Sequence, residues 1–182
     1  MKWILRILLG LVGLLVLAMV VLFALSKRPD AGKGDVTIDI ARPPDVVWQW
    51  ISEDTKLVRW VAWLTKVEHD PATPSGVGHR ETWVMSDPNS SQPMRLLSTV
   101  TQEDAPRSAA ARIEFAGGAG DVRFTLTDLG NGSTRLRQES AFRYTNPVYV
   151  LMEPLVTPEA HKKEVSDFAR LKQLAEAEAA RP

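Results

Sequence analysis

The feature that most constrains this chain is an uncharged apolar run near its N-terminus. Residues 7–25 read ILLGLVGLLVLAMVVLFAL, nineteen residues without Asp, Glu, Lys or Arg. As a helix rising 1.5 Å per residue, the run is about 28 Å long, close to the ~30 Å hydrocarbon layer of a bilayer. It lacks the polar stripe that a helix on a soluble core would show. We therefore predict a transmembrane helix within residues 1–26 that contacts the membrane through residues 7–25.

A cleaved signal peptide is the alternative interpretation of this segment. Lys2 and Arg6 form a basic leader, and Ala24 and Ser26 are small residues at the spacing of a cleavage site. The run exceeds the core of about 7 to 15 residues that signal peptides have, which favours a retained anchor. Basic residues flank both ends of the helix, so the charge rule does not set its orientation. From the short leader we expect a single-pass membrane protein with an extracytoplasmic (periplasmic) domain.

The rest of the chain has the size of one domain. Residues 27–34, KRPDAGKG, mix charge with Pro and Gly and predict a flexible linker, after which residues 35–182 form the domain. Lys and Arg together number 22, as do Asp and Glu, so no excess positive charge favours nucleic acid as a partner. Cysteine is absent, which excludes disulfides, zinc-thiolate sites and thiol nucleophiles.

The hydropathy pattern of the domain predicts an α+β fold. Val36, Ile38 and Ile40 alternate with polar residues as in a half-buried strand, and helical spacing follows from Pro43 onward, with a second short helix at residues 54–59. About six short extended segments then follow Leu64, separated by turn-forming stretches, which is typical of an antiparallel meander. One face of the last three strands is charged, and we expect its members to pair in solvent. These are Arg112, Glu114, Arg123, Arg135, Arg137, Glu139 and Arg143.

A long helix is expected to end the chain. Thr157 has the character of an N-cap and Pro158 that of a first helical residue. The apolar stripe of this helix needs a sheet face to cover, and its members are Val165, Phe168, Leu171, Leu174 and Ala175. Residues 145–156, TNPVYVLMEPLV, then form an apolar connection. It closes one end of the domain, acts as a gate, or touches the bilayer.

Three stretches of the domain resemble the START-like (SRPBCC) superfamily, the helix-grip fold of polyketide cyclase and dehydrase-like proteins. They are VTIDIARPPDVVWQWISEDTKLVRWVAW with its closing Trp60-x-x-Trp63, the hairpin DVRFTLTDLGNGSTRLRQES, and the terminal DFARLKQLAEAE. The likeness covers residues 36–178, and bacterial members that it resembles often begin with one membrane helix. It implies a curved antiparallel sheet wrapped around the C-terminal helix, with a cavity between them for a lipid, quinone, polyketide or aromatic metabolite.

Strand alternation and this resemblance together suggest the residues near such a cavity. If Leu136 faces inward, Gln138 and Ser140 do so as well, and as buried polar groups they need partners from a ligand, water or the backbone. The expected ligand-binding set is Trp60, Trp63, Trp83, Phe115, Phe124, Gln138, Ser140, Phe142 and Phe168. For the aromatic members, simple core packing is the competing interpretation.

The sequence assigns no catalytic residue. His79 and Glu81 share one strand face as a weak candidate acid/base pair, with an exposed polar edge as the alternative. The three histidines are far apart in sequence and match no HxH or HExxH spacing, so no metal site is expected. No cofactor motif is present either, because GGAGD lacks the glycines and helix of a dinucleotide site. We expect a membrane-anchored binding protein for a hydrophobic small molecule or lipid. The alternatives are a cyclase- or hydrolase-type enzyme and a ligand-free structural domain, and protein partners stay open.

Overall fold

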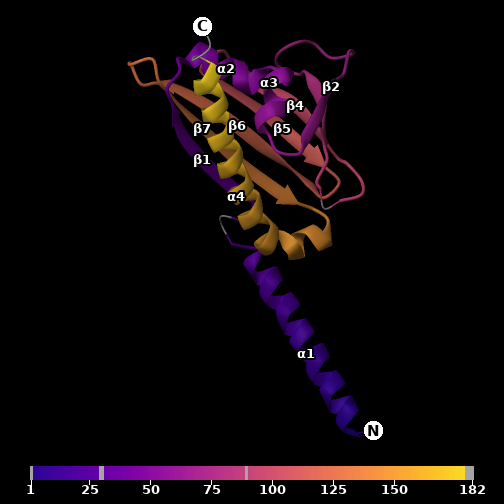
Figure 1. Cartoon of the computed structure of the whole chain (residues 1–182). Coiled ribbons are helices and arrows are strands. Elements are labelled where there is room, and N and C mark those ends of the chain that lie inside the picture. Colours follow the sequence, from indigo (N-terminus) through magenta and orange to yellow (C-terminus); the bar gives the residue numbers. More distant parts are fainter. Residues whose placement is uncertain (1, 29–30, 89, 179–182) are drawn as a thin grey trace.

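The protein consists of one N-terminal helix followed by a sheet-and-helix domain, in a computed structural model that describes residues 2–28, 31–88 and 90–178. Helix α1 (Lys2–Leu25) projects away from the domain (Figure 1). Among the described residues it is the one helix long and apolar enough to cross a membrane, and none of it is buried.

A seven-stranded antiparallel sheet forms the body of the domain, with strand order β1-β7-β6-β5-β4-β3-β2. Its strands are β1 (Lys33–Ile40), β2 (Leu64–His69), β3 (Arg80–Met85), β4 (Met94–Asp104), β5 (Ser108–Phe115), β6 (Gly118–Asp128) and β7 (Thr134–Tyr144). Short helices α2 (Pro44–Ser52) and α3 (Asp54–Trp60) join β1 to β2, and α4 (Pro147–Glu178) lies across one face of the sheet (Figure 1). The predicted α+β architecture, with its six-strand meander and terminal helix, is confirmed.

The start of α4 differs from the prediction. The helix begins at Pro147 rather than near Thr157, and Pro154 and Pro158 lie inside it. Asn146 acts as the cap, because its Oδ1 accepts a hydrogen bond of 2.9 Å from the Val148 amide. Asn146-Pro147 is thus the same kind of helix start signal as Thr157-Pro158. It was overlooked because the later prolines, Pro154 and Pro158, argued against a helix that continues through them. The apolar connection expected at residues 145–156 is therefore mostly helix.

The inner face of α4 also differs by one residue from the expected stripe. Phe168, Leu171 and Ala175 are buried as predicted, but Val165 is exposed. Its place toward the sheet is taken by Glu164, four residues before Phe168. A step of one residue turns a helix by about 100°, which carries Val165 off the face.

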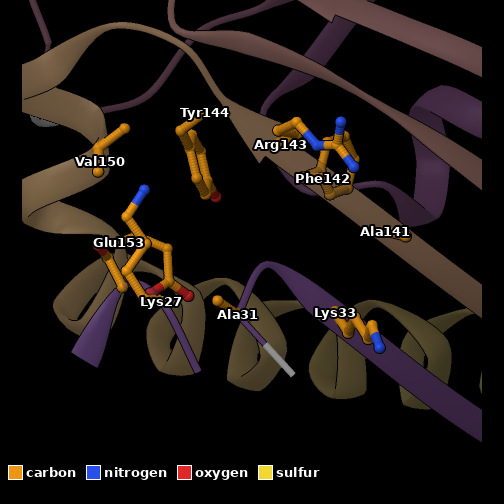
Figure 2. Close-up of a pocket in the computed structure, with 10 residues that line it drawn as sticks. Lys27, Ala31, Lys33, Ala141, Phe142, Arg143, Tyr144, Val150 and Glu153 are labelled. Carbon is orange, nitrogen blue, oxygen red and sulfur yellow. The ribbon is translucent and has the colours of Figure 1, made fainter. Parts of the chain in front are cut away.

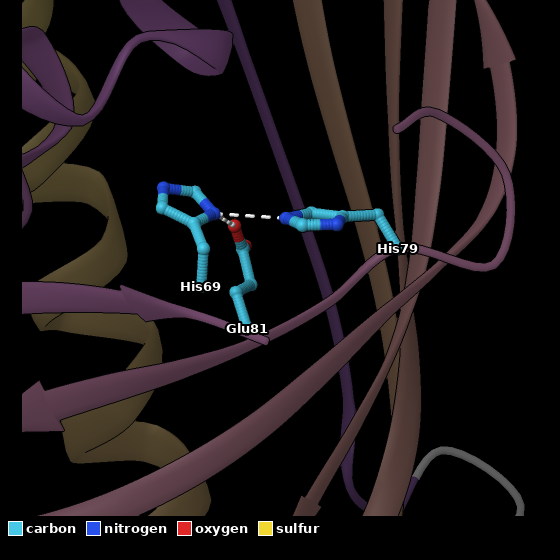
Figure 3. A group of neighbouring side chains, drawn as sticks. All are labelled: His69, His79 and Glu81. Carbon is cyan, nitrogen blue, oxygen red and sulfur yellow. Dashed lines mark hydrogen bonds and ion pairs between the residues drawn. The ribbon is translucent and has the colours of Figure 1, made fainter. Parts of the chain in front are cut away.

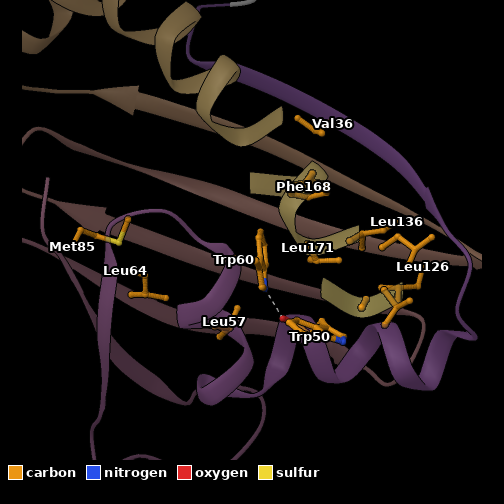
Figure 4. Packing of buried hydrophobic residues seen from close by; sticks show 13 residues of the cluster. Val36, Trp50, Leu57, Trp60, Leu64, Met85, Leu126, Leu136, Phe168 and Leu171 are labelled. Atoms are coloured by element: carbon orange, nitrogen blue, oxygen red, sulfur yellow. Dashed lines mark hydrogen bonds between the residues drawn. The ribbon is translucent and has the colours of Figure 1, made fainter. Parts of the chain in front are cut away.

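The core is concentrated where α2, α3 and the C-terminal part of α4 meet the sheet (Figure 4). Trp50 and Phe168 are fully buried there, and the Trp60 ring meets the Phe168 ring edge-on at 5.7 Å between centroids. The Trp60 indole donates a 2.7 Å hydrogen bond to the Trp50 carbonyl oxygen, which ties α3 to α2. Trp50, Trp60 and Phe168 therefore pack as part of the core at this end of the domain, and Trp60 and Phe168 were also predicted ligand-binding residues.

The outer face of the sheet carries the predicted charged residues, and several of them form ion pairs there. Arg135 holds both carboxylate oxygens of Asp39 at 2.7 and 2.8 Å, and Arg137 pairs with Asp35 on the same two strands. Each arginine lowers the pKa of the aspartate that it faces, mainly through these hydrogen bonds. Being half exposed, such pairs contribute little to stability.

The linker between α1 and the sheet is shorter than predicted. Lys33 and Gly34 already belong to β1, so the strand starts two residues before Asp35. The Arg28 guanidinium contacts the Glu153 carboxylate of α4 at 3.0 and 3.1 Å. Residues 29–30 of the predicted linker lie outside the described residues, and its flexibility stays a prediction.

Candidate functional site

A cavity of about 260 Å³ lies between α3, α4 and the inner face of strands β3 to β7. We call it the far chamber, because it lies on the side of the domain away from α1. Its wall is mostly apolar, and Ala109 and Ala111, whose small side chains share the inner face of β5, leave room for it. The predicted ligand-binding residues that line it are Trp60, Trp83, Phe124, Gln138, Phe142 and Phe168.

Several polar side chains interrupt this apolar wall. Gln138 donates a 3.3 Å hydrogen bond from Nε2 to Glu164 Oε1, so strand alternation placed Gln138 correctly. Asp167 pairs with Lys163 at 2.5 Å and accepts a 3.1 Å hydrogen bond from the Ala62 amide. A few polar groups in an apolar wall are what orients a small molecule in a pocket.

Glu164 is one of the titratable groups in the cavity wall that the sequence analysis missed, together with Lys163 and Asp167. Burial raises the pKa of its carboxyl, an effect reduced by the nearby charge of His161 and by the hydrogen bond from Gln138. Its position four residues before Phe168 and seven before Leu171 was the available signal, because those spacings share one helix face.

A second chamber of about 250 Å³ adjoins the first toward α1, and we call it the near chamber. The two share Leu96, Ile113, Phe142 and Glu164 in their walls. The predicted residues Phe115 and Ser140 line the near chamber, together with Tyr144 and Tyr149. Together the two volumes fall within the range of about 300–1,000 Å³ that ligand pockets occupy.

Aromatic rings surround the near chamber. Tyr144 and Tyr149 stack with their planes 8° apart, and Phe115 meets both rings edge-on. Gly117 allows this, since a Cβ there would lie 2.7 Å from the Tyr149 ring. Burial raises the pKa of the Tyr144 hydroxyl, consistent with its position in an apolar wall.

An open, charged hollow of about 480 Å³ lies beside the near chamber, where the chain after α1 passes β7 and α4 (Figure 2). It shares Lys33, Phe142 and Tyr144 with the near chamber, and Lys27 and Arg143 add positive charge.

Trp63 is the predicted ligand-binding residue that lines neither chamber. Its backbone has a positive φ of 71°, its side chain is partly exposed, and the Lys163 ammonium lies 5.1 Å from the centre of its ring. The W-x-x-W pattern therefore separates into one tryptophan in the cavity wall and one outside it.

His79 and Glu81 are joined by a third residue that sequence spacing did not bring near them (Figure 3). The β2–β3 register sets His69 directly opposite Glu81, and His69 Nδ1 lies 2.8 Å from His79 Nε2. Glu81 lines the far chamber and is mostly buried, so the alternative of a fully exposed polar edge does not describe it. Residues distant in sequence meet here through strand pairing, so the spacing of the histidines along the chain did not reveal this cluster.

The model of the family described as polyketide cyclase / dehydrase and lipid transport matches residues 32–176. The chain belongs to this family. The match spans the whole sheet and most of α4, and it confirms the resemblance seen in the sequence. No curated protein matches the chain.

Solved structures share the fold at low sequence identity. TTHA0849 from Thermus thermophilus superposes with a TM-score of 0.65 at 17% identity, covering 80% of this chain and 97% of that one. NE0264 from Nitrosomonas europaea gives 0.63 at 14% identity, with 85% and 100% covered. DynU16, a putative protein in the dynemicin biosynthetic locus, gives 0.57 at 16% identity, with 80% and 47% covered. These likenesses establish the fold alone.

Proposed function

We propose that this chain is a membrane-anchored binding protein that holds a hydrophobic small molecule between the sheet and α4. The observation that carries the proposal is the pair of adjoining apolar chambers with a few polar groups in their walls. Burying apolar ligand surface there contributes about 25 cal/mol per Å², while Gln138 and Glu164 orient a polar group. The family description, which includes lipid transport, agrees with this use of the cavity.

The surface around the near chamber supports a position against the bilayer. Val148, Met152 and Leu155 are 66%, 40% and 53% exposed at the start of α4, next to the end of α1. Apolar side chains gathered in this way commonly mark membrane or protein contacts. With α1 kept as an anchor, the near chamber would face the lipid surface from the extracytoplasmic side.

The ligand class that these features favour is an amphipathic lipid, rather than a quinone or polyketide without a charged group. The chambers suit its apolar part, and the adjacent hollow presents Lys27, Lys33 and Arg143. Basic side chains at a membrane surface attract anionic headgroups.

A filled-cavity variant tests the binding proposal. Ala111 of β5 lines the far chamber and shares the inner face of the sheet with Val100 and Val122, so Ala111→Phe should occupy its space. Ala119→Phe, on the outer face of β6 beside Glu114 and Arg143, is the matched control. In native mass spectrometry of protein extracted gently from membranes, we expect a lipid-sized adduct on the wild type and control and its loss from Ala111→Phe. An adduct that is absent from the wild type, or equal in all three, would refute the proposal.

The anchor and its side of the membrane need separate measurements. Intact mass of the membrane-extracted protein should include residues 1–26, and a protease added outside spheroplasts should digest the domain. A mature N-terminus near Leu25, or complete protection from the protease, would overturn the respective part of the proposal.

Glu164 favours a second candidate function, an enzyme of cyclase or hydrolase type. A carboxyl whose pKa burial raises, placed where both chambers meet, has the properties of a general acid. If this candidate is correct, wild type and Glu164→Gln will carry adducts that differ by the mass of a chemical conversion. Identical adducts would contradict the enzyme candidate and leave binding as the proposed function.

A further inference from the structure

Three side chains converge at the edge of the far chamber, one from β2, one from β3 and one from the residue just before β3. His69 at the end of β2 is the cross-strand partner of Glu81 in β3, and His79 precedes Glu81 by two residues. One ligand atom from each side chain lies within 4.8 Å of the other two. The register of the β2–β3 pair therefore creates a cluster of two imidazoles and one carboxylate (Figure 3).

The atoms of this cluster that point outward are all held by hydrogen bonds. Asp54 of α3 lies 2.6 Å from His69 Nε2 through its Oδ2. The Pro74 carbonyl oxygen lies 3.0 Å from His79 Nδ1, and the Thr73 hydroxyl, which donates its proton to the Asp70 carbonyl oxygen, lies 3.2 Å from it. The Trp83 indole donates a 2.6 Å hydrogen bond to Glu81 Oε1, which leaves Glu81 Oε2 on the side of His69, at 3.8 Å from its Nδ1.

These bonds fix the tautomers of the two rings. A carboxylate and a backbone carbonyl can only accept, so His69 carries its proton on Nε2 and His79 on Nδ1. The neutral rings then direct lone pairs at each other from His69 Nδ1 and His79 Nε2, which are 2.8 Å apart. Two lone pairs at that distance repel, so a cation or a shared proton is required between them.

We propose that His69, His79 and Glu81 bind one divalent transition-metal ion, with Zn²⁺ as the preferred ion. Two imidazole nitrogens and a carboxylate oxygen are a ligand set that zinc uses with a fourth position open. Two nitrogens on a tetrahedral zinc lie about 3.3 Å apart, so the rings need to separate by only about half an ångström. Asp54 and the Pro74 carbonyl act as the outer partners that orient zinc-bound histidines.

The metal lies at the wall of the far chamber, because Glu81 and Trp83 line that chamber. The site is separate from Glu164 and Gln138, and it does not depend on which molecule the chambers hold. A shared proton, with one ring as imidazolium between Asp54 and Glu81, is the competing account, and it predicts no metal affinity.

The test uses the full-length protein in detergent micelles, titrated with Co²⁺ as a spectroscopic probe and then with Zn²⁺. We expect visible ligand-field bands that saturate at one Co²⁺ per chain and vanish when Zn²⁺ displaces it. His69→Ala and His79→Ala should each weaken binding more than about 100-fold, and Asp54→Asn about 10- to 100-fold. His161→Ala, the remaining histidine, is the control and should bind as the wild type does.

A second measurement guards against variants that fail to fold. Zn²⁺ should raise the midpoint of thermal unfolding of the wild type and of His161→Ala, but not that of His79→Ala, whose far-UV circular dichroism should match the wild type. Absent bands, or binding that survives in the His69→Ala/His79→Ala double variant, would overturn the site. Lipid-sized adducts are measured separately, so failure here leaves the binding proposal standing.

Discussion

The two halves of α4 are held to the same sheet by different forces. The far half, residues 164–178, buries Phe168, Leu171 and Ala175 in the core. The near half, residues 147–157, exposes most of its large apolar side chains and buries Glu153 instead. Apolar packing thus secures the far half, whereas the near half is held by the polar cluster at Glu153 and by the Tyr149 ring against Tyr144. The difference teaches that the near half can move or meet another apolar surface without dismantling the core.

Removing apolar volume from the far half should have the largest effect. Leu171 is 0% exposed, and Leu171→Ala should lower the free energy of unfolding by about 2–5 kcal/mol through lost burial and a residual cavity. Urea unfolding of the full chain in micelles, followed by tryptophan fluorescence, measures this loss. A loss below about 1 kcal/mol would mean that the far half is not the packed anchor.

Breaking the polar cluster of the near half should have the next largest effect. Glu153 accepts hydrogen bonds from Arg28, from the Gly32 amide at 3.0 Å and from the Thr157 hydroxyl at 2.8 Å. Glu153→Gln keeps the shape but removes the charge, and should reduce stability by about 1–3 kcal/mol. Trypsin should then cleave after Lys27, next to Arg28, faster than in the wild type.

The matched control for this prediction is Glu159→Gln, an exposed glutamate of the same helix paired with Lys162. Equal cleavage rates in both variants and the wild type would show that the cluster does not hold the linker against α4.

The sequence predicted what depends on local periodicity. Alternation in β7 placed Leu136, Gln138 and Ser140 inward and set Arg135 and Arg137 outward, because strand side chains alternate irrespective of partners. The family resemblance supplied the order of elements and the cavity between sheet and α4. Alternation depends only on neighbouring residues, and the resemblance depends on short sequence stretches, so both can be recognised in a single sequence.

What the sequence did not predict depends on register or on competing signals. His69 and Glu81 become neighbours only through the β2–β3 pairing, which no spacing along the chain encodes. The start of α4 was missed because Pro158, like Pro147, satisfies the rule for a first helical residue. Glu164 was passed over because the stripe was drawn through apolar residues alone.

Glu164 lies where the two halves of α4 meet, and its pH dependence sharpens the comparison. Burial raises its pKa above the ordinary value of 4.5, so the folded protein binds the proton more tightly than the unfolded chain does. The contribution of Glu164 to the free energy of unfolding is therefore fully present below about pH 4.5. It is lost as the pH rises through the raised pKa. Glu164→Gln should therefore be more stable than the wild type at neutral pH. The gain should be smaller than the losses expected for Leu171→Ala and Glu153→Gln.

Unfolding free energies of the wild type and Glu164→Gln, measured from about pH 4 to about pH 8, test the direction of this pH dependence. The difference should grow with pH, and Glu159→Gln should show no such growth. A difference that shrinks with rising pH would mean that the carboxylate is stabilised in the fold, against its position in the apolar wall.

Leu155→Ala should have the smallest effect and is the matched partner of Leu171→Ala. Both changes remove the same atoms from the same helix, but Leu155 is 53% exposed, so its loss should alter stability by no more than about 0.5 kcal/mol. The same urea experiment in micelles measures it. A loss above about 1 kcal/mol would show that Leu155 is covered in the micelle by detergent or by a second chain. Repeating the measurement at several protein concentrations separates the two, because only a second chain makes the loss depend on concentration.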